Sequence, residues 1–207
     1  MKIPLVGAVV ATVLALSGCT IAIPAPSPVH GAIAPGPESH VYATPAALRT
    51  VITFVFGPDS LILRSQAGVV ESLPFTESKA HAIAVLKTVL GKPLSTLVAT
   101  SLPSSYGLSW NGFFASYSDA KSSPGQRQWL AAANAPTTGK IQLVTNAGAS
   151  VGSSIASVQR SPGVLVKHES KLVLLAIPNA DRSGFLVFNP DAKHPGKIGQ
   201  IRSMGQF

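Results

Sequence analysis

The amino-acid sequence predicts an α+β fold, in which an antiparallel sheet packs against two or three short helices. Several short runs of β-branched and aromatic residues end at Gly, Pro or Asp, which is the pattern of strands bounded by turns. Residues 76–90 instead repeat apolar side chains at spacings of three and four, the pattern of a helix. We place the globular domain at residues 47–207, a length that suffices for one hydrophobic core.

The first elements of this domain are two strands and a helix. Residues 51–56 and 61–63 are predicted strands on either side of a Gly-Pro-Asp turn. The predicted helix begins at Thr76, a residue type that caps helix N-termini, and it ends before Gly91 and Pro93.

The later elements are mostly strands. Residues 108–117 are predicted as a strand, residues 119–126 as a polar turn, and residues 127–133 as either helix or strand. The remaining segments are predicted to be a strand at 141–145, a Gly-rich turn, a short helix at 153–160, and strands at 164–168, 172–177 and 185–188.

The first eighteen residues have the features of a secretion signal. An apolar stretch follows Lys2 and is too short to span a bilayer, which needs about 20 apolar residues. It ends in the residues Leu16-Ser17-Gly18-Cys19, which resemble the lipobox of bacterial lipoproteins. The alternative is a signal peptide that is cut elsewhere, with Cys19 incidental, although Cys19 is the only cysteine of the chain.

The lipobox resemblance implies cleavage before Cys19 and attachment of a diacylglyceryl lipid to its thiol, with fatty acyl chains such as palmitate. The protein would then be a lipid-anchored lipoprotein on the extracytoplasmic face of the cell membrane. Residues 19–46 would contain the lipidated cysteine and a tether, because their many prolines favour extended polyproline II at about 3.1 Å per residue. The membrane is therefore an expected partner through the lipid.

The net charge of +8 has two interpretations. The basic residues are scattered singly, which is typical of a solvated surface, but their sum would also favour anionic lipid, an anionic wall polymer or an acidic envelope protein. Nucleic acid is not an expected partner, because the chain is exported and has no basic run.

An internal match raises the question of a duplication. Residues 61–68 and 141–148 share the pattern apolar-x-apolar-x-hydroxyl-x-Ala-Gly at an offset of 80. They could mark two strand-turn-helix-strands units, at residues 50–133 and 139–207, or they could be similar by chance. Residues 139–202 also resemble modules of small envelope lipoproteins and of the β-lactamase inhibitor protein. That resemblance implies a protein-binding role, although those inhibitors contain disulfides and many aromatics, which this chain lacks.

One segment also allows a catalytic interpretation. Residues 148–152 read GASVG, which satisfies the G-x-S-x-G pattern of a nucleophile elbow, and Asp181 and His194 follow Ser150 in the order of an α/β-hydrolase triad. The alternating strand–helix crossovers of that fold are absent from the pattern. We therefore expect the glycines to form a turn, and we keep a small serine hydrolase using Ser150 as the alternative.

Neither a metal nor a cofactor is expected. The five histidines show no pairing at ligand spacing, and the few carboxylates lie in turn contexts. The sequence therefore favours a non-catalytic binding or interaction module of the cell envelope over an enzyme.

Overall fold

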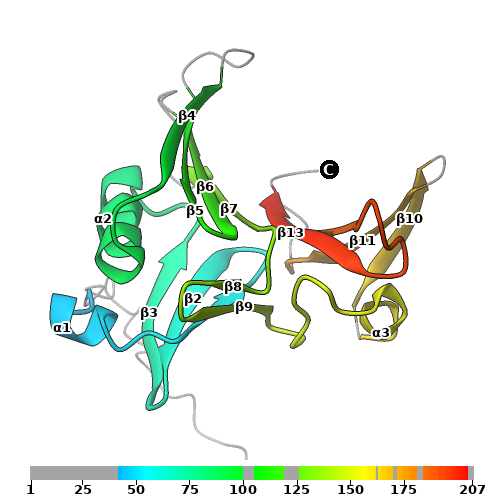
Figure 1. Cartoon of the computed structure of the whole chain (residues 1–207), viewed down its shortest axis with the longest axis horizontal. Helices are drawn as coiled ribbons and strands as arrows, with labels where there is room; N and C mark the ends of the chain where they lie inside the picture. Colours follow the sequence, from blue (N-terminus) through cyan, green and yellow to red (C-terminus); the bar gives the residue numbers. More distant parts are fainter. Residues whose placement is uncertain are drawn as a thin grey trace, which may run out of the picture. The chain divides into compact units, whose positions relative to one another are not determined.

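The computed structural model describes residues 42–99, 105–118, 126–161, 163–169, 172–180 and 184–204. These residues fall within one compact unit, Val41–Phe207. Cys19, most of the tether and Asp181 lie outside the described residues. The described part of the chain forms two sheets and three helices (Figure 1).

The smaller sheet has the strand order β3-β2-β1-β9-β8. Its strands are β1 (Thr53–Phe56), β2 (Ser60–Ser65), β3 (Gly68–Pro74), β8 (Thr137–Thr138) and β9 (Ile141–Thr145). β1 and β9 pair in parallel and the other pairs are antiparallel. The parallel pair joins the first third of the domain to a strand about ninety residues later.

The larger sheet has eight strands, and all its pairs are antiparallel. Its strands are β4 (Ser95–Ala99), β5 (Ser105–Trp110), β6 (Phe113–Ser118), β7 (Trp129–Ala133), β10 (Leu165–Glu169), β11 (Leu172–Pro178), β12 (Phe185–Pro190) and β13 (Ile198–Met204). The strand order β10-β11-β12-β13-β7-β6-β5-β4 consists of two four-stranded meanders that meet at β13 and β7.

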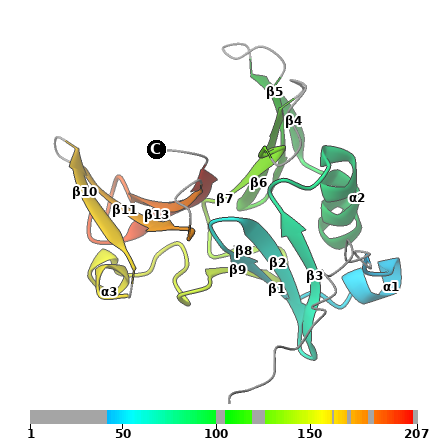
Figure 2. The same cartoon turned by 180° about the vertical axis from the view of Figure 1, so that it is seen from behind.

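The helices are α1 (Pro45–Leu48), α2 (Lys79–Leu90) and α3 (Ile155–Gln159). The Ser78 side chain caps α2 by accepting the His81 N–H at 3.3 Å, and Gly91 ends it with a φ of 76°. The Trp110 indole N–H donates to the Gly91 carbonyl at 3.1 Å, which fixes this end of α2 to β5. Figures 1 and 2 show α2 beside the β4–β5 end of the large sheet and α3 beside the β10–β11 end.

Residues 42–46, predicted to be the end of the tether, belong to this unit. The Ala43 N–H donates to the buried Glu71 carboxylate on β3 at 2.6 Å. The rings of Tyr42 and His81 lie 3.9 Å apart between centroids. The described contacts of the domain therefore include residues 42–46, a few residues before the predicted boundary at residue 47.

The hydrophobic core lies between the two sheets and α2. Phe113 of β6 packs edge-on against Phe54 of β1, with ring centroids 5.4 Å apart, and it also contacts Phe56 and Trp110. A second set of aromatic rings crosses the large sheet in register and ends at Phe75, the residue that follows β3. It comprises Tyr106, Tyr117, Trp129 and Phe75. These contacts bind the sheets face to face.

The predicted α+β class is wrong. The described residues form thirteen strands in two packed sheets and only one helix longer than five residues, so the fold is mostly β and closer to a β-sandwich. The error arose because the sequence analysis left out β3, β4 and β13 and read residues 108–117 as one strand. That segment is the β5–β6 hairpin, and Asn111-Gly112 forms its two-residue turn.

The residues that suggested a repeat do not occupy equivalent places. Residues 61–65 form β2, which turns directly into β3, whereas residues 141–145 form β9, which leads towards α3. β2 pairs in antiparallel fashion with β1 and β3, whereas β9 pairs in parallel with β1 and antiparallel with β8. Residues 127–133, left open between helix and strand, include β7.

We expect Phe113→Ala to destabilise the domain by about 3–5 kcal/mol, because it removes a fully buried ring from the contact between the sheets. Phe114→Ala is the matched control, since Phe114 is adjacent in sequence, points to the opposite face and is only half-buried. Chemical denaturation would measure the free energy of unfolding of both variants. Equal losses in the two variants would contradict the assigned core.

Candidate functional site

The strand registers place few charged residues on the face of the large sheet turned away from the core: Arg202 on β13, and Lys167 and Glu169 on the edge strand β10. The strand registers place one residue from each strand in a single row, which we call the outer row: Ser95, Ser109, Phe114, Ala132, Arg202, Val187, Ala176 and Leu165. Arg202, next to the centre, is its only charged member. A solvated sheet face normally shows a polar, often charged residue at every second position, so this face has the composition of a contact surface.

A concavity lies over the central strands of this face. We call it the trough, and it is lined by Ser109, Phe113, Phe114, Ser116, Leu130, Ala131, Ala132, Asn134, Gln200, Arg202, Ser203 and Met204. Its volume is about 450 Å³. This lies within the roughly 300–1,000 Å³ of small-molecule sites, which combine apolar walls with a few polar groups in the same way.

The trough lies where the two meanders separate. β13 and β7 pair at Ile201–Ala133 and Arg202–Ala132. At the next position the Ser203 hydroxyl accepts the Ala131 N–H at 2.9 Å and donates to the Ala131 carbonyl at 3.2 Å. The Ser203 side chain thus takes the place of a main-chain hydrogen-bonded pair between β13 and β7. Because the strands are wider apart there, the outer face is hollowed beside Arg202 and Met204.

Small side chains line the trough on the side away from β13, over β5, β6 and β7. Gly107 of β5 lies under the ring of Phe114, and a Cβ at this position would collide with that ring. Phe114 is therefore laid flat across β5. The small side chains of Ser109, Ser116 and Ala132 line the trough between the bulky side chains Phe114 and Leu130.

Arg202 is the only ionisable group that lines the trough. It is exposed, and its Nη2 lies 3.9 Å from the Met204 sulfur. Within the described part of the chain no carboxylate pairs with it, whereas Gln200 accepts a hydrogen bond from Asn189 at 3.0 Å. The guanidinium donors are thus available to a ligand.

The residues of the catalytic alternative are not brought together as a triad. Ser150 Oγ lies 3.4 Å from Ser153 Oγ, and the Ser150 N–H donates to the same hydroxyl at 3.0 Å. His194 instead contacts Asp191, with Nδ1 3.4 Å from Oδ1. No hydrogen bond joins Ser150 to His194, both of which are described, and Asp181 lies outside the described residues.

The contacts around His194 are those of a tight loop between β12 and β13. The backbone N–H groups of His194 and Lys193 donate to Asp191 and hold the pKa of its carboxyl below the ordinary value. The support that Asp191 gives the loop is therefore present at neutral pH and is lost as the pH falls through that lowered pKa. Gly148 and Gly152 have φ values of 75° and 89° and turn the chain between β9 and α3.

No group of three or more His, Cys, Asp or Glu is positioned to hold a metal among the described residues. His81 lies with Nε2 4.0 Å from the Glu71 carboxylate, while His30 and His40 lie outside the described residues.

No helix in the described ranges is long and apolar enough to cross a membrane.

Of the residues that line the trough, the sequence draws attention only to the aromatics Phe113 and Phe114, which fit either a ligand-binding surface or core packing, and the other lining residues were missed. The signals were present but weak: residues 198–204 alternate core and outer side chains, and Asn-Gly at 111–112 is typical of a hairpin. The registers that align Phe114, Ala132 and Arg202 join strands that are distant in the chain, so no local pattern contains them.

We expect that Ser150→Ala and His194→Ala leave any labelling by a fluorophosphonate serine-hydrolase probe unchanged, because Ser150 is bonded to Ser153 and not to an imidazole. The measurement is in-gel fluorescence of the purified protein beside a known hydrolase. Labelling that disappears in both variants would establish the hydrolase instead.

Comparison of the chain with protein-family models, with characterised proteins and with solved structures finds no match.

Proposed function

We propose that this protein is a lipid-anchored, extracytoplasmic binding module that holds its ligand on the outer row of the large sheet, in the trough. The observation that supports it is the outer row itself, in which eight strands contribute a single charged residue beside a concavity of about 450 Å³. Of the apolar members of the outer row, Phe114 is half-buried and Leu165 is exposed, and covering the apolar area that they leave in water is favourable.

The groups that line the trough suit binding better than catalysis. They comprise hydroxyls, amides and one guanidinium, and the described lining contains no imidazole or carboxylate. Hydroxyl and amide groups orient a ligand by hydrogen bonds, whereas general acid–base chemistry needs a group that titrates near the working pH. We therefore propose no reaction for this site.

The anchor in this proposal is the lipid on Cys19. Each buried methylene contributes about 0.8 kcal/mol of membrane affinity, so two or three acyl chains would hold the domain durably. The tether of residues 19–46 would keep the domain at the membrane surface while leaving the outer row accessible to ligands in the envelope.

We expect Cys19→Ser to move the protein from the membrane fraction to the soluble fraction without changing the thermal unfolding of the domain. The substitution removes the acylated thiol and touches no residue of the folded unit. The measurement is fractionation after a high-salt wash, which removes electrostatic attachment. A Cys19→Ser protein that still pellets after this wash would show that the anchor is not the lipid.

We expect the mature chain to bind the apolar fluorophore N-phenyl-1-naphthylamine, and Ala132→Glu to weaken this binding by about tenfold or more, because it places a charge on the trough floor. Gln142→Glu, at an exposed position of β9, is the matched control and should bind as the unaltered protein does. Fluorescence titration measures both. Equal binding by the two variants would place the fluorophore elsewhere.

A further inference from the structure

We propose that the ligand of the trough is a single-chain amphiphile with an anionic head group, its head on Arg202 and its alkyl chain along Phe114, Leu130 and Met204. This inference rests on the proposed function and gives the chemical class of its ligand. Three features of the site support it: the isolated cation, the apolar floor, and the main-chain N–H and C=O groups beneath that floor, which are already engaged in hydrogen bonds within the sheet.

Arg202, the isolated cation, favours a ligand with an anionic head group. Arg202 is the only charged member of the outer row, and within the described part of the chain it has no carboxylate partner. A guanidinium presents a planar set of donors that matches the two oxygens of a phosphate or carboxylate. Its bond to an anion would also be strengthened by the apolar surroundings, which lower the local dielectric.

The apolar floor of the trough favours a ligand with an alkyl chain. Phe114, Leu130 and Ala132 line the trough on β6 and β7, and Met204 lines it on β13. Met204 also packs against a second apolar cluster on the same face, formed by Ala176, Phe185 and Val187. The flexible thioether of a methionine adapts to chains of different shape.

The backbone beneath the floor argues against a peptide ligand. β5 and β6 pair with neighbours on both sides, and β7 pairs with β6 along its length. On its other side β7 pairs with β13 at Ala132 and Ala133, and the Ser203 hydroxyl takes the N–H and C=O of Ala131. A peptide lying there would bury its own amides with few partners, which is costly. An alkyl chain has no such groups to satisfy.

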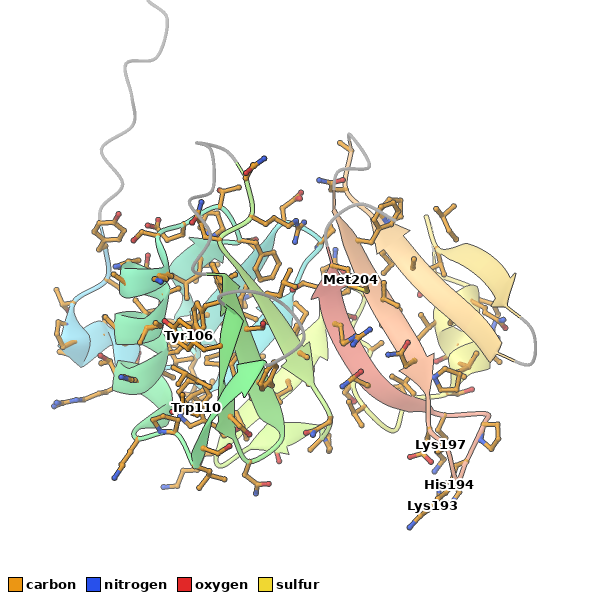
Figure 3. The ribbon with its side chains drawn as sticks, turned by 90° about the horizontal axis from the view of Figure 1, so that it is seen from above. Tyr106, Trp110, Lys193, His194, Lys197 and Met204 are labelled. Atoms are coloured by element: carbon orange, nitrogen blue, oxygen red, sulfur yellow. The ribbon has the colours of Figure 1, made fainter. Side chains whose placement is uncertain are left out.

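The placement of the other cations argues against an anionic polymer in the trough. Figure 3 shows Lys193, His194 and Lys197 grouped on the β12–β13 loop, whereas Met204 lies at the other end of β13. A polyanion needs several cations along its path, and the trough offers one. A ligand with a single charge therefore fits the site best.

The test is calorimetric titration of the mature chain carrying Cys19→Ser, below the micelle concentration, with dodecyl phosphate, dodecanol and inorganic phosphate as probes. We expect dodecyl phosphate to bind about tenfold or more tightly than dodecanol, since a charge-assisted hydrogen bond is added. Inorganic phosphate should bind far more weakly than either, and shortening the chain should weaken binding about fourfold for each methylene that is buried.

Arg202→Met should abolish the preference for dodecyl phosphate over dodecanol and leave dodecanol binding unchanged. Arg64→Met is the matched control, because Arg64 is also an exposed strand arginine, on β2 of the other sheet. Arg202→Lys serves as a second variant that keeps the charge, and it should retain part of the preference. Both Arg202 variants should unfold at the temperature of the unaltered protein.

The outcomes separate the two proposals. Equal affinities for dodecyl phosphate and dodecanol, unaffected by Arg202→Met, would overturn the anionic head group while the trough remains a binding site. Inorganic phosphate binding as tightly as dodecyl phosphate would overturn the alkyl chain. If neither amphiphile nor the fluorophore binds, the proposed function itself is wrong.

Discussion

The junction between β7 and β13 is the interaction on which the rest of the structure depends. It joins two four-stranded meanders into one sheet through two main-chain residue pairs and the Ser203 hydroxyl. Without it the eight-stranded sheet would be two separate sheets, and each would expose apolar edges. Because the junction is short, the strands diverge beside it, and the same feature that completes the fold also forms the trough.

The two faces of this sheet have opposite roles because of strand periodicity. Along β6, Phe113 and Ala115 point into the core, while Phe114 and Ser116 point outward. The inner face is closed by the small sheet and α2, and it holds the largest buried rings. On the outer face Ala132, Ala176 and Val187 are already buried among their neighbours, whereas Phe114, Leu130 and Met204 are half-buried. The apolar area that these three leave exposed is the physical basis for proposing that a ligand covers this face.

The G-x-S-x-G segment shows why a motif needs its scaffold. Its glycines do turn the chain after a strand of a parallel pair, as an elbow would. α3 is only five residues long, however, and Ser150 is bonded to the neighbouring Ser153. His194 lies in a loop closed by Asp191. The residues therefore follow one another in the order of a catalytic triad, but Ser150 and His194 do not have its geometry.

The sequence by itself determined the local elements: the strand Thr53–Phe56, the end of the helix at Gly91, and the turn around Gly148 and Gly152 follow from side-chain type and backbone preference. The start of that helix was predicted two residues too early, because Thr76 and Ser78 are both suitable caps and Ser78 is the one used. It did not determine the fold class, because strands such as β3 and β13, each seven residues long, contain glycine and polar residues of low strand preference and depend on their partner strands for stability. Tertiary structure alone decided that Phe114, Ala132 and Arg202 are neighbours, since main-chain pairing between distant strands sets that register.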